Sequence, residues 1–153
     1  MTQRQTLTTL RDLLAEAETR AAQRFGAANQ ACAEAQRKLQ TLEQFRDEYR
    51  DKYRAALERG DPFALLENLR QFLARLDQAI NLQTDAVAHA AQEVEQARAA
   101  WQAAMGKRKA FDLLLARQTA AEKAQEEKSA QKLLDEWASL RAIRTHDEGG
   151  THR

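Results

Sequence analysis

The chain has 153 residues, of which 31% are charged and 43% hydrophobic, and its formal net charge is +1 at pH 7. Five glycines and one proline are too few to supply the turns of an all-β fold, whereas the abundant alanine, glutamate, glutamine, lysine, arginine and leucine favour helices. Charges that nearly cancel and alternate in sign argue against a nucleic-acid partner. The composition therefore predicts an all-α protein.

The first helix is expected from about residue 6 to residue 59, starting in the region of Thr6 to Thr9, where Thr9 and Asp12 are spaced as an imperfect capping box. Charged residues from Arg11 onward interrupt this segment before an apolar run of signal-peptide length, and no window approaches the roughly 18 consecutive apolar residues of a membrane span. We therefore expect a protein that stays inside the cell, with only peripheral contact to any membrane.

A turn is expected at residues 60–62, where the chain reads Gly60-Asp61-Pro62. Glycine suits a helix C-cap, aspartate an N-cap and proline the first helical position. The second helix then runs from about residue 62 to residue 144, and residues 145–153 are expected to be a disordered tail. Residues 1–144 are thus predicted to form a single hairpin.

Both predicted helices carry apolar residues at the alternating 3-4 spacing of a coiled coil. In the second helix the main series is Leu66, Leu73, Ile80, Val87, Val94, Trp101 and Leu115, failing at Arg108, and the companion series fails at Gln83 and Gln118. In the first helix the clean series is Leu14, Ala21, Ala28, Ala35, Leu42, Tyr49 and Ala56, and Phe25, Cys32, Leu39 and Tyr53 supply part of the other. We call these positions the seam.

Folding at residue 61 pairs positions whose numbers sum to 122, and this register makes the two seams coincide. It sets Ala21 against Trp101 and Phe25 against Ala97, small residues against large ones. We therefore predict an antiparallel coiled-coil hairpin whose C-terminal helix is longer and overhangs. A parallel homodimer of long helices is the alternative, and the turn signal at residues 60–62 disfavours it.

The sequence offers no catalytic residues, no metal site and no cofactor site. His89 is predicted at a solvent-facing position without a second ligand at metal spacing, and His146 and His152 fall in the expected tail. Cys32 lies in the seam, where a thiol behaves as a small hydrophobe, and as the single cysteine it forms no internal disulfide. A two-helix fold also encloses no cleft of the kind that enzymes use.

Two apolar surfaces indicate protein docking instead. Five of the nine aromatic residues fall within 28 residues spanning the predicted turn: Phe45, Tyr49, Tyr53, Phe63 and Phe72. The g positions beside the seam, which are usually charged, hold Phe45, Leu65, Phe72, Ala79 and Ala86. This flank is either a docking surface or a widened core near the turn.

The second surface lies near the C-terminus. After a polar, alanine-rich stretch, an amphipathic stripe returns with Leu133, Leu134, Trp137, Leu140 and Ile143. A lone helix cannot bury such a stripe, so it implies a partner or a second chain unless it is a frayed end.

The chain resembles the FliJ family of the bacterial flagellar type III export apparatus over nearly its whole length. The resemblance rests on Thr9-Leu10-Arg11-Asp12-Leu13, Cys32, Leu39, Leu42, Glu48-Tyr49-Arg50, Gln71-Phe72-Leu73 with Leu76, Ala79 and Ile80, then Trp101, Arg117-Gln118 and Asp135-Glu136-Trp137-Ala138. It implies a non-enzymatic two-helix coiled coil similar to the central stalk of rotary ATPases.

The expected partners are the hexameric flagellar export ATPase, the cytoplasmic domain of the export gate and export chaperones, at the cytoplasmic face of the inner membrane at the flagellar base. The family's gate-docking surface carries over to Leu42, Phe45, Tyr49, Phe72, Leu76 and Ala79, with Lys38 and Gln83 differing from the family pattern. Binding to the ATPase ring is assigned to Leu7, Leu10, Leu13, Leu133, Leu134, Trp137, Leu140 and Ile143.

Two alternatives remain open from the sequence. The equivalent stalk of a virulence-type injectisome would have the same shape and the same role toward an ATPase, and the flagellar or injectisome genes beside this one would separate the two systems. A generic coiled-coil scaffold would have no affinity for an export ATPase and no use for the aromatic flank.

Overall fold

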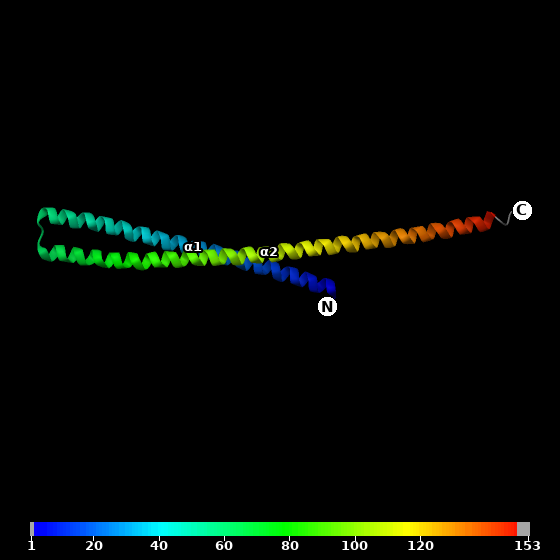
Figure 1. Ribbon diagram of the computed structural model, residues 1–153, viewed down its shortest axis with the longest axis horizontal. Coiled ribbons are helices and arrows are strands. Elements are labelled where there is room, and N and C mark those ends of the chain that lie inside the picture. The colour runs from blue at the N-terminus through cyan, green and yellow to red at the C-terminus, as the bar shows by residue number, and fades with distance from the viewer. Residues whose placement is uncertain (1, 150–153) are drawn as a thin grey trace. The chain divides into compact units, whose positions relative to one another are not determined.

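A computed structural model describes residues 2–149 and contains two α-helices, α1 (Gln3–Arg59) and α2 (Phe63–Gly149), which Figure 1 labels along the colour gradient. The described residues form no β-strand. With 57 residues in α1 and 87 in α2, the predictions of an all-α fold and of a longer second helix are confirmed. The last four residues of the expected tail lie outside the described part of the chain.

The chain divides into two compact units, which are described separately. The hairpin unit comprises residues 12–106, and the terminal unit comprises residues up to Arg11 together with those from Lys107 onward. Within the hairpin unit α1 and α2 pack against each other in antiparallel directions on either side of the turn (Figure 1). The predicted antiparallel pairing is confirmed.

The turn is built around Gly60, whose φ of 69° is left-handed. The Asp61 N–H donates to the Ala56 carbonyl at 3.1 Å and the Gly60 N–H to the Leu57 carbonyl at 3.2 Å, the two bonds of a Schellman motif. The Asp61 carboxylate accepts from Arg59 at 3.1 Å. The Pro62 carbonyl accepts the first bonds of α2, so this helix begins at Phe63, one residue after its predicted start.

The N-terminus of α1 lies earlier than the expected region of Thr6 to Thr9. The Gln5 N–H donates to the Thr2 hydroxyl at 3.3 Å, and the Thr2 N–H donates to the Gln5 side-chain oxygen at 3.0 Å. This reciprocal pair is a capping box, and it starts the helix at Gln3. The hydroxyl of Thr9 instead donates back to the Gln5 carbonyl at 2.9 Å, as a residue inside a helix does.

At its other end α2 continues to Gly149, five residues past the expected end at residue 144. Thr145 is helical, and its hydroxyl contacts the carbonyls of Arg141 and Ala142 at 3.1 and 3.0 Å. The helix therefore continues through a polar segment whose composition had indicated a tail.

The core of the hairpin unit is the predicted seam. Its most buried apolar residues are Ala56, Leu76, Ile80 and Val94, which are 1 to 9% exposed. Half-buried residues recur between them at 3-4 spacing along both helices. Because each helix has one neighbour, most large seam residues keep an exposed edge, and the flanking positions are left open to solvent.

The part of the seam near Trp101 holds two stacked aromatic residues. The rings of Phe25 and Trp101 are 5.8 Å apart and nearly parallel, at 4°. The register prediction had set Trp101 opposite Ala21, whereas its ring meets Phe25. Helical side chains lean toward the N-terminus, so in an antiparallel pair Phe25 and Trp101 lean toward each other across one turn. Arg98 lies over the Phe25 ring at 5.7 Å.

Polar residues at seam positions turn their charged groups toward carboxylates on the same helix. Arg46 contacts Asp47 at 3.4 Å, and Arg108 of the terminal unit contacts Asp112 at 2.8 Å. Their side chains are only 25% and 29% exposed, so the aliphatic stems cover apolar surface while the charged heads reach solvent.

The glycines provide a test of this packing. A Cβ added at Gly26 or Gly106 meets no atom within 4 Å, so Gly26→Ala and Gly106→Ala should each raise the free energy of unfolding by about 0.5–1 kcal/mol. Gly60→Ala should lower it by about 1 kcal/mol because of the left-handed φ. Urea unfolding monitored by circular dichroism measures the free energy of unfolding of all three variants. A loss of stability in the Gly26→Ala or Gly106→Ala variant would contradict the packing described.

Candidate protein-docking surfaces

The described residues include no group of three or more histidine, cysteine or acidic side chains that could hold a metal ion, and no helix among them is long and apolar enough to cross a membrane. His89 is exposed and lies 3.8 Å from Glu93. Cys32 is half-buried in the seam.

The first candidate is the aromatic surface, which we define as Leu42, Phe45, Tyr49, Phe72, Leu76 and Ala79. At its centre the rings of Tyr49 from α1 and Phe72 from α2 lie 4.5 Å apart with a tilt of 49°. Such a tilted pair is a favourable aromatic geometry. The contact spans the two helices, so their pairing is what assembles this surface.

Exposure differs among these six residues. Phe45 is 46% exposed and Phe72 38%, which is unusual for phenylalanine, while Leu42, Tyr49 and Ala79 are half-buried. Leu76 is only 8% exposed and belongs to the core. Phe45 and Phe72 are therefore the members of this surface that are most available to a partner, whereas Leu76 is part of the core.

Cationic side chains border the aromatic surface. The ammonium of Lys52 lies 4.6 Å above the Tyr49 ring, within the range of a cation–π contact. Arg50 lies 4.0 Å from Asp77 across the two helices, and both side chains are about half exposed. An apolar centre with a charged rim is the usual anatomy of a protein interface.

The second candidate is the terminal stripe, which we define as Leu133, Leu134, Trp137, Leu140 and Ile143. These residues are between 59 and 67% exposed, with Trp137 the most exposed of them. Leu134, Trp137 and Arg141 line a shallow depression along α2. The stripe is helical, and among the described residues it has no apolar cover, as the sequence predicted for a partner-binding segment.

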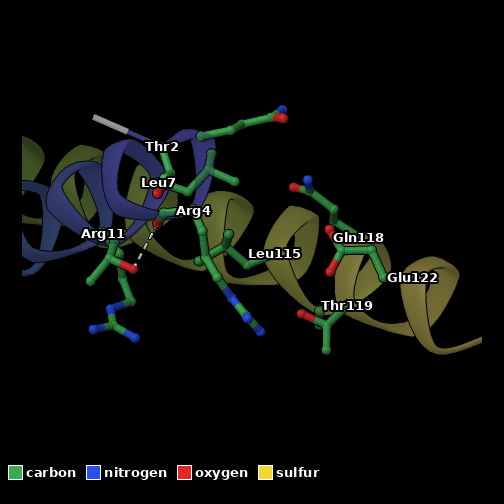
Figure 2. A pocket seen from close by; sticks show the side chains of 11 residues that line it. Thr2, Arg4, Leu7, Arg11, Leu115, Gln118, Thr119 and Glu122 are labelled. Atoms are coloured by element: carbon green, nitrogen blue, oxygen red, sulfur yellow. Dashed lines mark hydrogen bonds between the residues drawn. The ribbon is translucent and has the colours of Figure 1, made fainter. Parts of the chain in front are cut away.

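The N-terminal leucines assigned to the same function are placed differently from one another. Leu7 is half-buried in an open cleft of about 550 Å³ within the terminal unit. Figure 2 shows Leu7 and Arg4 of α1 on one side of this cleft and Leu115, Thr119 and Glu122 of α2 on the other. Leu10 is 43% exposed, and Leu13, in the hairpin unit, is 55% exposed.

Several exposed apolar residues were missed by the sequence analysis as binding candidates. Leu82 is 72% exposed, and Leu113 and Leu114 are 54% and 60% exposed. Phe63, which the sequence had already placed among the aromatic residues near the turn, is 79% exposed. Leu114 continues the series of g positions that includes Phe72, and that spacing is a signal by which it can be found.

Comparison with known proteins gives one consistent result. The family model described as "Flagellar FliJ protein" matches residues 3–146. A curated relative from Salmonella typhi, named "Flagellar FliJ protein", is 30% identical over 144 residues, covering 94% of this chain and 98% of the relative. The two chains thus correspond along nearly their full lengths.

The exposure of the terminal stripe is testable by fluorescence. In a Trp101→Phe variant the remaining Trp137 should emit as a solvent-exposed indole and be quenched readily by acrylamide, because it is 67% exposed. In a Trp137→Phe variant the remaining Trp101, stacked on Phe25, should have a smaller quenching constant. Equal quenching of the two, or weaker quenching of Trp137, would mean that the stripe is covered within the free protein.

Proposed function

Because the chain belongs to the flagellar FliJ family, we propose that it serves the flagellar type III export apparatus as a stalk-like coiled coil without catalytic activity of its own. The observation that carries the proposal is the family match over nearly the whole chain. The paired helices of the hairpin unit are the kind of fold expected of a stalk. Its place is the cytoplasmic face of the inner membrane at the flagellar base, reached through its partners.

The aromatic surface is proposed to bind the cytoplasmic domain of the export gate. Phe45 and Phe72 supply exposed rings, and Tyr49 holds Phe72 through their contact at 4.5 Å. Aromatic side chains that lose their exposed area in an interface dominate binding energy. Leu76 supports the surface from the core, so its replacement would act through packing and not through a lost contact.

The terminal stripe, with Leu7, Leu10 and Leu13, is proposed to bind the hexameric export ATPase. An apolar face repeated along several turns suits insertion into a groove between partner helices. Burying the stripe would remove five large side chains from water, each now more than half exposed. Handling of emptied export chaperones is the third proposed activity, and no residues are assigned to it.

The stalk of a virulence-type injectisome remains the alternative function, and the family match favours the flagellar system. Mixing the protein with its cognate export ATPase and nucleotide tests the main proposal by light scattering. Formation of ATPase hexamers that each carry one copy of this chain supports it. A folded, active ATPase that neither binds the chain nor assembles differently would reduce the function to a generic coiled-coil scaffold.

Gate binding yields the next prediction. Combining Phe45→Asp with Phe72→Asp should weaken binding to the gate's cytoplasmic domain about tenfold or more, because it places two carboxylates where apolar rings must be desolvated. Calorimetry measures the affinity and swimming assays report the effect in cells. Leu57→Asp, at a residue 50% exposed on the other flank of α1, is the matched control and should bind normally. Unchanged gate affinity in the folded double variant would show that the aromatic surface does not bind the gate.

A corresponding prediction concerns the ATPase. Deleting residues 131–153 should abolish binding and ring assembly, and Trp137→Ala with Leu140→Ala should weaken binding about tenfold or more, because both remove apolar area from the terminal stripe. Ser139→Ala, at an exposed polar residue of the same segment, is the control. Co-sedimentation with the ATPase measures each, and full binding by the truncated chain would show that the stripe has another role.

A further inference from the structure

Gln83 is a polar residue inside the apolar seam. Its nearest seam neighbours on α2 are Ile80, which is 7% exposed, and Val87, which is half-buried. A polar group at such a position costs stability unless it finds a hydrogen-bond partner. The residue therefore requires an explanation that general coiled-coil packing does not provide.

The explanation lies on the opposite helix. The Gln83 side-chain nitrogen donates to the backbone carbonyl of Ala35 at 2.9 Å, a part-buried bond between residues 48 positions apart. A carbonyl inside a helix keeps a second lone pair for such a bond. Ala35 has the short side chain that lets the amide reach the backbone, whereas Leu42, one heptad along the same series, would cover it.

We infer that Gln83 is a positioning residue that fixes the register of α2 against α1 at the level of Ala35. A single polar residue in a coiled-coil seam specifies register at some cost in stability. The Schellman turn at Gly60 fixes the register at one end of the pair. Gln83 supplies a second fixed point about 30 Å along α2 from its start at Phe63, at about 1.5 Å of rise per residue.

The aromatic surface lies between these two fixed points. Tyr49 and Phe72 come from different helices, and both fall on the turn side of the Gln83 bond. A change of register would carry Phe72 away from Tyr49 and dismantle the surface. This consequence for docking rests on the proposed function, whereas the fixing of the register does not.

Thiol cross-linking tests the inference directly. Every protein carries Cys32→Ala so that only introduced thiols react, and Arg50→Cys is combined in turn with Arg70→Cys, Asp77→Cys or Thr84→Cys, which are spaced by one heptad. The Arg50 guanidinium and the Asp77 carboxylate lie 4.0 Å apart, so a cross-link between residues 50 and 77 reports the native register. Cross-links from residue 50 to residue 70 or 84 report displaced registers. With Gln83 present, a short bifunctional reagent should link mainly the native pair.

Two substitutions then separate the hydrogen bond from packing. Gln83→Leu introduces an apolar side chain of similar size, and Gln83→Glu keeps the shape of the glutamine side chain. At neutral pH neither side chain donates a hydrogen bond to the Ala35 carbonyl. In both, the ratio of displaced to native cross-links should rise about fivefold, as expected for loss of one hydrogen bond. Gln78→Leu, at an exposed position of α2, is the control and should leave the ratio unchanged.

An unchanged ratio in the Gln83→Leu variant would overturn the inference. A rise in the Gln83→Glu variant alone would also overturn it, because burial of a charge would then be the cause. Circular dichroism confirms that each variant is folded, and the apolar substitution should leave the thermal midpoint equal or higher. The assay measures helix pairing alone, so its outcome and that of the gate-binding experiment can be told apart.

Discussion

The burial of one apolar stripe against another is the interaction on which the rest of the structure depends. Two helices can cover only the facing sides of each other, so just four apolar residues in the seam of the hairpin unit are less than 10% exposed: Ala56, Leu76, Ile80 and Val94. The same geometry leaves the flanks open. Phe45 and Phe72 are exposed because they lie beside the seam, and a third helix or a partner is needed to cover them.

The apolar seam stabilises the pairing of the two helices, whereas directional hydrogen bonds specify its register. Apolar side chains at 3-4 spacing stabilise the pair but distinguish one heptad from the next only weakly, since several heptads present similar aliphatic side chains. The Schellman motif at Gly60 and the bond from Gln83 to Ala35 are directional, so they distinguish one register from another. A docking surface made from two helices requires both kinds of interaction.

The sequence was sufficient to predict the helices, the turn and the seam, because periodicity and the Gly60-Asp61-Pro62 signal are local. It missed the start of α1 because the capping box at Thr2 precedes the first apolar repeat. It did not predict the stack of Phe25 on Trp101, which depends on the lean of side chains across the pair. For the candidate sites, heptad position predicted that Phe45 and Phe72 are exposed. The resemblance to the family's docking surface did not distinguish these two residues from Leu76, which belongs to the core.

The thin core of the hairpin unit influences how the sequence of such a protein can evolve. Seam residues pack on neighbours close to them along the axis, so a substitution that leaves the register unchanged acts mostly at its own level, as it does in repeat proteins. The region around Trp101 and the region around Phe72 are then free to diverge almost independently. A fold of this kind can exchange one partner for another at one level while the contacts at a distant level are retained.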